Sequence, residues 1–141
     1  MSDLNRVDNW RQEFEAVADD LMTLPFVWGQ QDCGPGFVGR LTQALTGVDL
    51  AADYRGQYDS ALSALRLMQD LGFANLGDLV ASILPEIHIS QARIGDIAAV
   101  ADDTPFGFAL GVVNGERIYV RTQSGLGTVD LLDAARAFKV G

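Results

Sequence analysis

The chain has 141 residues, of which 48% are hydrophobic, so it is long enough for one domain around a single core. Its 19 acidic and 10 basic side chains give a formal charge of −9, which repels phosphate backbones and anionic lipids and argues against nucleic-acid binding. The single cysteine excludes an internal disulfide and a cysteine-rich zinc site.

No segment of the chain has the pattern of a targeting signal or a membrane span. Residues 1–20 include six acidic side chains and no continuous apolar core, so we expect no secretory signal peptide. No apolar run approaches the length of about 18 residues that a membrane span requires, so we expect no membrane insertion.

Apolar residues recur at helical spacing in four stretches of the first 85 residues. In the first stretch these residues are Val7, Trp10, Phe14, Val17 and Leu21. Prolines, glycines and an asparagine cap set the boundaries. Four helices are predicted. The first begins near Asp3 and ends before Pro25, and the second runs from Pro35 to Gly47. The third covers residues 61–71, and the fourth runs from the cap Asn75 to Pro85.

From Gly95 onward the pattern changes to short apolar runs separated by turn residues, which predicts strands. Asn114-Gly115 readily takes the backbone angles of a type I′ turn and predicts a hairpin. The expected strands are Ile97–Val100, 110–113, 116–120 and Leu126–Leu131. We therefore predict an α+β fold, with N-terminal helices packed on a C-terminal antiparallel sheet of about four to five strands, as a single domain over residues 1–141.

Two kinds of motif that would bind a cation or a phosphate are incomplete. The acidic pairs Asp19-Asp20 and Asp102-Asp103 lack the ordered oxygen ligands of a cation-binding loop. The run Gly125-Leu126-Gly127 lacks the lysine and the strand-to-helix context of a phosphate loop. We expect neither a metal nor a cofactor.

Cys33 is the candidate nucleophile of this sequence. It ends the segment Phe26 to Cys33 (FVWGQQDC) and lies just before the helix predicted to start at Pro35. Backbone N–H groups at the start of a helix stabilise a thiolate, and they could also bind the oxyanion formed from an attacked carbonyl. A cysteine nucleophile also needs a base, and the only histidine, His88, is a weak candidate for that role.

The residues beside Cys33 are expected to shape a turn. Gly29 is predicted to make the turn, and Asp32 is predicted to hold it by accepting hydrogen bonds from backbone N–H groups. Trp28 either floors a substrate groove or, as is more common for a large aromatic side chain, packs in the core.

These motifs resemble the NlpC-type cell-wall peptidases of the papain-like cysteine-peptidase superfamily. The resemblance is carried by Trp28-Gly29, by Asp32-Cys33 before a helix, and by Gly95-Asp96 before a strand. It implies a papain-like fold and an ancestor that hydrolysed peptides in murein.

The same resemblance places an alanine where those enzymes have their catalytic histidine. Their His-Val-Gly-Ile strand corresponds to residues 109–112 of this chain, so Ala109 occupies the histidine position. A third polar residue of the family falls near Arg121, which is permanently charged and cannot accept a hydrogen bond from a base. The resemblance therefore implies a degenerate member with impaired catalysis.

The whole chain also resembles a family of short proteins found among the tail genes of phages, prophages and gene-transfer agents. The resemblance is carried by FVWGQQDC, LTGVDL at 45–50, LPEI at 84–87, and GDIAAV before ALGVV. It implies a protein made in the host cytoplasm and located in the virion, at the tail tip or hub. The expected partners are other tail-tip or hub proteins, with peptidoglycan peptides as a further ligand.

Three functions remain open at this point. The first is a structural tail-tip or hub protein with a degenerate NlpC-type fold. The second is an active cysteine peptidase or amidase in which Cys33 attacks and His88 or a partner chain supplies the base. The third is a cytoplasmic binding domain unrelated to virions. For His88 itself a structural role is favoured, because it precedes Gly95 and so lies outside the motif.

Overall fold

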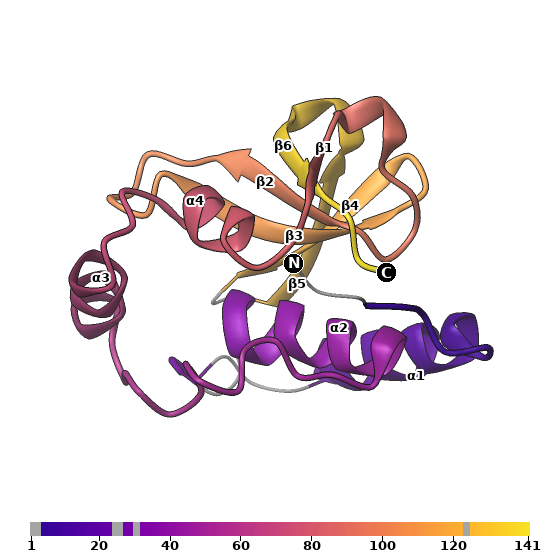
Figure 1. Cartoon of the computed structure of the whole chain (residues 1–141), viewed down its shortest axis with the longest axis horizontal. Helices are drawn as coiled ribbons and strands as arrows, with labels where there is room; N and C mark the ends of the chain where they lie inside the picture. The colour runs from indigo at the N-terminus through magenta and orange to yellow at the C-terminus, as the bar shows by residue number, and fades with distance from the viewer. Residues whose placement is uncertain (1–3, 24–26, 30–31, 123–124) are drawn as a thin grey trace.

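In the residues that the structure describes, the fold comprises four α-helices and a six-stranded antiparallel sheet (Figure 1). The structure is a computed structural model and describes residues 4–23, 27–29, 32–122 and 125–141. The predicted α+β class is therefore confirmed. None of the described helices combines the length and the apolar character that crossing a membrane requires.

The helices are α1 (Trp10–Thr23), the π-helical turn η1 (Cys33–Val38), α2 (Gly39–Thr46), α3 (Ala61–Asp70) and α4 (Leu76–Ala81). Several predicted ends are confirmed, but the helical segment predicted to start at Pro35 begins at Cys33, and α4 ends at Ala81, before the predicted boundary at Pro85. Ser60 caps α3 by accepting a hydrogen bond from the Ser63 N–H, and Asn75 caps α4 by accepting one from the Asp78 N–H at 2.8 Å.

The first helix begins later than the spacing of apolar residues predicts. It starts at Trp10, and the residues before it form an arm. The N–H of Val7 donates to the Leu45 carbonyl at 2.7 Å, and Arg6 pairs with Asp96. These tertiary bonds replace the hydrogen bonds that a longer helix would form. The predicted boundaries Asp3 and Pro25 lie outside the described residues.

The sheet has more strands than the four to five that were predicted. The strands are β1 (Glu86–Ile87), β2 (Ile97–Ala101), β3 (Phe108–Asn114), β4 (Arg117–Thr122), β5 (Gly125–Asp130) and β6 (Ala134–Phe138), in the order β1-β6-β2-β3-β4-β5. The additional strands are β1 and β6. β1 is too short to produce a pattern, and β6 is rich in alanine, which has a low strand propensity.

The β3–β4 hairpin forms one residue later than predicted. Asn114 pairs with Arg117, so Gly115 and Glu116 form the loop. Among the described residues, positive φ angles occur only at glycines, and Gly115 has φ +71°. A glycine at the first loop position is typical of a type II′ turn rather than the predicted type I′ turn. Asn114 stays in the strand and donates a hydrogen bond to the Tyr119 hydroxyl at 2.9 Å.

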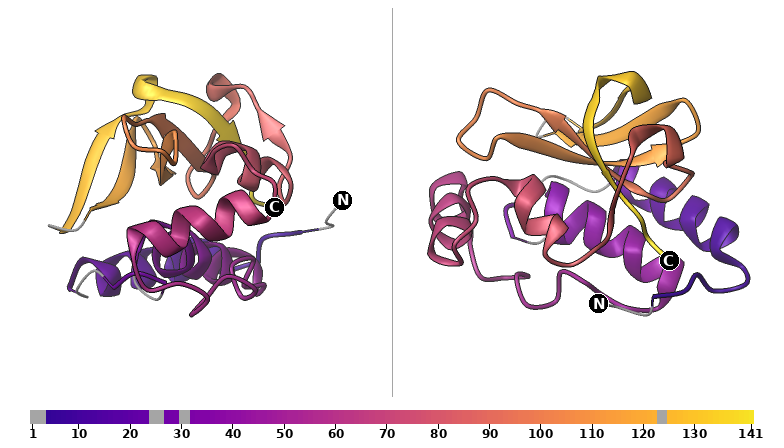
Figure 2. Two further views of the ribbon diagram at one scale, coloured as in Figure 1. Left: turned by 90° about the vertical axis from the view of Figure 1, so that its left-hand side faces the viewer. Right: turned by 45° about the horizontal axis from the view of Figure 1, so that its top comes forward.

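Two groups of buried side chains lie on the two faces of the sheet. The larger core lies between the sheet and the layer of α1 and α2 (Figure 2), and it includes Phe14, Phe37, Leu41, Leu110, Val112 and Phe138. The smaller core lies on the other face and is built around Ala98, Val113, Ile118 and Ala134. Small residues on this second face let the short segments η2 (Ile89–Gln91) and η3 (Leu131–Asp133) approach the sheet.

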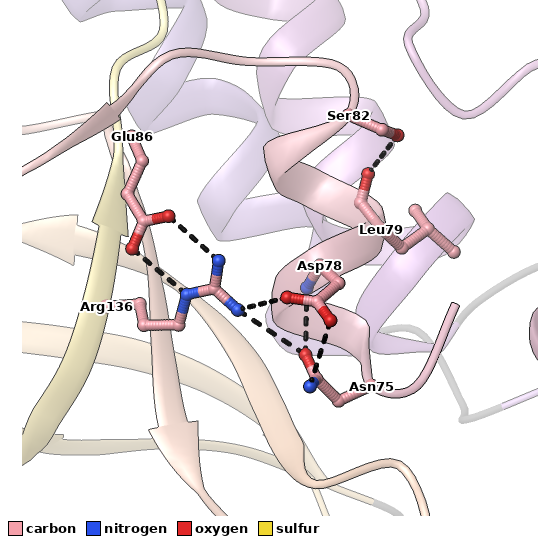
Figure 3. Close-up of polar contacts among 6 residues, drawn as sticks. All are labelled: Asn75, Asp78, Leu79, Ser82, Glu86 and Arg136. Carbon is pink, nitrogen blue, oxygen red and sulfur yellow. Dashed lines mark hydrogen bonds and ion pairs between the residues drawn. The ribbon is translucent and has the colours of Figure 1, made fainter. Parts of the chain in front are cut away.

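Arg136 on β6 joins the sheet to α4 (Figure 3). Its guanidinium binds both carboxylate oxygens of Glu86, at 3.0 and 2.8 Å, and one oxygen of Asp78 at 2.9 Å. A Cβ atom at Gly77 would lie 2.5 Å from Arg136 Nη1, so the glycine leaves room for this side chain. The hydrogen bonds to Glu86 and Asp78 raise the pKa of Arg136, and the hydrogen bond from Arg136 lowers the pKa of Glu86.

The pair of Glu86 and Arg136 predicts a stability difference that depends on pH. A carboxylate whose pKa falls on folding stabilises the fold above its unfolded pKa, and this contribution is lost as the pH falls through the folded pKa. Glu86→Gln should therefore be less stable than the wild type at neutral pH, by at most about 1 kcal/mol because the pair is partly exposed. The difference should become smaller near pH 3, because the stabilisation is lost progressively as the pH falls below the ordinary pKa of 4.5 and through the lowered pKa of the folded state.

Urea unfolding of both proteins at neutral pH and near pH 3 measures this difference. Glu116→Gln, at an exposed position in the β3–β4 loop, is the matched control. A stability difference for Glu86→Gln that is the same at both pH values would contradict the prediction.

Candidate functional site

The turn that leads into η1 is held together by a buried carboxylate. Asp32 is 2% exposed and accepts hydrogen bonds from the N–H groups of Gly29, at 3.1 Å, and Gly36, at 3.3 Å. The Tyr58 hydroxyl also donates to it. Two of these bonds are the backbone bonds predicted for Asp32, and the third fastens the turn to the loop between α2 and α3.

Gly29 makes this turn in a conformation that a side chain would not tolerate. Its φ angle is +81°, and a Cβ atom here would lie 2.1 Å from the Tyr58 carbonyl oxygen. The Gly29 carbonyl in turn accepts a hydrogen bond from the Gly56 N–H at 3.0 Å. The backbone of residues 56–58 therefore lies directly against the turn, and the role predicted for Gly29 agrees with this geometry.

A large open pocket of about 500 Å³ lies beside this turn. Asp32 and Trp28 border it on one side, and the β2–β3 hairpin borders it on another. α3 and α4 contribute further walls, which are mostly aliphatic, and the loop between α2 and α3 contributes Leu50, Tyr54 and Tyr58. Trp28 is half-buried and stacks on Phe106, with ring centroids 6.4 Å apart. Trp28 therefore lines the pocket and lies outside the main core.

Ala109 borders the same pocket, from β3. It pairs across the sheet with Val100, which belongs to the smaller core, whereas Leu110 belongs to the larger core beneath the helices. η1 packs against β3 and β4, so the segment that begins at Cys33 lies against the strand that carries Ala109. Trp28, Asp32 and Ala109 thus border one pocket, but the side chain of Ala109 shares the sheet face of Val100 and the smaller core.

The side chains of two predicted site residues lie outside the described part of the structure. Cys33 is the first residue of η1, and Arg121 belongs to β4. The structure describes the backbone of these two residues but not their side chains.

His88 has the contacts of a structural cap. It is exposed and precedes η2, and its Nδ1 accepts a hydrogen bond from the Ser90 N–H at 3.1 Å and lies 2.8 Å from the Ser90 hydroxyl. It follows β1, which is at the edge of the sheet, with β6 and β2 between it and β3. His88 does not line the pocket formed by the described residues.

The sequence did not indicate which residues would complete the pocket. Tyr58, Phe106 and the apolar face of α3 come from segments far from Trp28 and Asp32 in the chain. The apolar spacing in α3 was visible, but it predicted an ordinary packed helix. Among the described residues, there is also no group of three or more His, Cys, Asp and Glu side chains that could hold a metal ion.

Comparison with known families gives a match that covers almost the whole chain. A family model described as a domain of unknown function (DUF6950) matches residues 5–140. No curated protein matches the chain. The match groups the chain with related sequences but assigns it no activity.

Proposed function

Because this chain belongs to the DUF6950 family, whose function is unknown, we propose its role from its motifs and its pocket. We infer that it is a virion protein of the tail tip or hub, built on a degenerate papain-like, NlpC-type fold. It acts mainly through contacts with other tail proteins, and it also binds murein peptides. This proposal comes from the resemblance of the motifs, and the geometry of the motif segments supports the proposed NlpC-type ancestry.

The arrangement of the motif segments supports the NlpC-type ancestry. In such a fold a helical segment that begins with the cysteine packs on an antiparallel sheet. Here η1 begins at Cys33 and contacts β3 and β4. The strand that follows Gly95-Asp96 is β2, and it pairs with β3, which carries Ala109.

The observation that carries the proposed loss of catalysis is the placement of the only imidazole. His88 caps η2 and is exposed, whereas alanine stands at position 109 beside the pocket. A cysteine nucleophile needs a base within hydrogen-bond reach. Ala109 carries no base, and His88 is held in a cap outside the pocket, which argues against a cysteine–histidine dyad.

Incubation of the purified chain with murein peptides tests the proposed loss of catalysis. We expect no cleavage, and we expect the wild type and Cys33→Ala to be indistinguishable when products are separated by liquid chromatography. An active NlpC-type peptidase run in parallel shows that the substrate is competent. Cleavage by the wild type that Cys33→Ala abolishes would establish the active-peptidase alternative instead.

Alkylation of Cys33 distinguishes the proposed loss of catalysis from an active peptidase without any substrate. Iodoacetamide reacts with the thiolate, so an activated cysteine is modified well below about pH 8. We expect Cys33 to be modified slowly below that pH. Mass spectrometry of the intact chain measures the rate of modification. Rapid modification at pH 6 would contradict the proposed loss of catalysis.

The position of the gene tests the proposed virion location. A gene for this chain that lies away from tail genes would contradict that location.

A further inference from the structure

The α3 helix builds one wall of the pocket and has few other contacts with the rest of the protein. Figures 1 and 2 show α3 at the edge of the molecule, apart from the layer of α1 and α2. Its pocket-lining residues are Ala61, Ala64, Leu67 and Met68, followed by Leu71 just after its end. Of these only Met68 is buried, and Leu71 is 47% exposed. The apolar face of α3 thus points into the pocket and lacks the close packing of a core helix.

The opposite wall is equally apolar and is better anchored. α4 contributes Leu76, Leu79 and Val80, and the β2–β3 hairpin contributes Phe106 and Phe108. α4 is held to the sheet by its contacts with β3 and β6 and by the Arg136 bond to Asp78. The pocket therefore lies between a fixed wall and α3.

The size of the pocket indicates a ligand rather than a packing defect. Its volume of about 500 Å³ lies within the range of about 300–1,000 Å³ that is typical of small-molecule sites. Apolar side chains that line an open pocket stay in contact with water, and removing apolar surface from water is favourable. A ligand with an apolar chain would cover that surface.

The charges around the pocket restrict the end group of such a ligand. The lining residues include no lysine, arginine or histidine, and they include the carboxylates Asp32 and Asp102. Asp32 is already occupied by its turn, whereas Asp102 is exposed and accepts a hydrogen bond from the Thr104 hydroxyl at 3.1 Å. With a chain charge of −9, an anionic end group would be repelled and a cationic one attracted.

We propose that this pocket binds a small amphiphile with one apolar chain and a neutral or cationic end group. The apolar chain lies between α3 and α4, and the end group lies at the rim beside Asp102. The proposal goes beyond the proposed function and does not depend on it, because α3 and α4 lie in the chain between Cys33 and Gly95, outside the motif segments that carry the peptidase resemblance.

The two tryptophans of the chain allow a direct test by nuclear magnetic resonance. Trp28 lines the pocket, whereas Trp10 lies on α1 and does not line it. The ¹⁵N-labelled full chain is titrated with octylammonium, 1-octanol and octanoate, which share one chain length and differ in charge. We expect the Trp28 indole signal to move with the first two compounds and the Trp10 signal to stay in place. Octanoate should bind at least tenfold more weakly than octylammonium.

The length of the apolar chain provides a second measurement in the same titration. Each additional methylene that enters an apolar site should strengthen binding by about fourfold. The affinity should therefore rise from hexyl- to octyl- to decylammonium. Affinity that does not change with chain length would overturn the proposal, because the apolar chain would then lie outside the pocket.

Matched substitutions separate filling of the pocket from general damage to a helix. Ala64→Phe adds a ring on the pocket face of α3 and should weaken octylammonium binding at least tenfold. Ala81→Phe makes the same change at an exposed position of α4 outside the lining and should leave the affinity within twofold. Asp102→Asn should reduce the preference for octylammonium over octanol. Unchanged binding by Ala64→Phe, equal binding of octanoate and octylammonium, or no Trp28 response would each overturn the proposal.

Discussion

Replacing Asp96 with alanine is expected to lower the free energy of unfolding by about 3–5 kcal/mol, the usual cost of leaving a buried charge without its partner. The side chains of Asp96 and Arg6 are 1% and 5% exposed, and their charged atoms lie 3.0 Å apart. The carboxylate also accepts hydrogen bonds from the N–H groups of Val140 and Arg93, both at 3.0 Å. Alanine would remove the acceptor of all three donors.

This ion pair joins three distant parts of the chain. Arg6 donates further hydrogen bonds to the carbonyls of Ile94, at 2.6 Å, and Val140, at 2.8 Å. Burial and the neighbouring arginines lower the pKa of Arg6, whereas Asp96 raises it. The arm before α1, the loop before β2 and the segment after β6 are thus held at one point. Loss of Asp96 should therefore weaken the whole fold.

Urea unfolding of Asp96→Ala, Arg6→Met and the double variant measures this effect. The double variant should be less damaged than the sum of the single variants, by about 1–3 kcal/mol, because it leaves no unpaired buried arginine. It should remain less stable than the wild type, because two backbone N–H groups still lack their acceptor.

The half-exposed pair of Arg55 and Asp49 provides the control for the buried pair. Its side chains are 25% and 20% exposed, so Arg55→Met should cost only about 0–1 kcal/mol. Asp96→Ala and Arg55→Met with equal costs would contradict the central role of the buried pair.

Gly29→Ala is expected to have the second large effect, because the new methyl group would collide with backbone. Its Cβ atom would lie 2.1 Å from the Tyr58 carbonyl oxygen. The loop of residues 56–58 would have to move away, which would break the bond from the Gly56 N–H and strain the bond from Tyr58 to Asp32. We expect a cost of about 1–3 kcal/mol from this collision, in addition to the cost of the positive φ angle.

Gly47→Ala separates the two costs. Gly47 has the same φ angle of +81°, but no atom lies within 4 Å of the Cβ position. Its cost should therefore be that of left-handed backbone alone, about 1–2 kcal/mol. Urea unfolding gives both values, and Trp28 fluorescence should change only in Gly29→Ala. Equal costs for the two variants would show that the loop does not press on the turn.

Local interactions made part of the fold predictable from the sequence. α3 follows from apolar spacing, and α4 follows from apolar spacing and from the cap Asn75, whose partner lies three residues away. The Ser60 cap of α3 is equally local but was not predicted. The predicted start of α1 was wrong, because Arg6 forms an ion pair with Asp96, which lies 90 positions later in the chain. The strand β6 was missed because Ala137, which is fully buried opposite Ala98, owes its place to close packing and not to strand propensity.

The candidate site divides in the same way. The sequence by itself determined the turn at Gly29 and Asp32, since a glycine at positive φ and a carboxylate that binds N–H groups three and four residues away are local features. Only the tertiary structure decided that Tyr58, 26 positions later, completes this turn and that Ala109 borders the same pocket. It also decided that α3 and α4 enclose an apolar space, because the position of one wall relative to another depends on contacts between segments that sequence spacing does not encode.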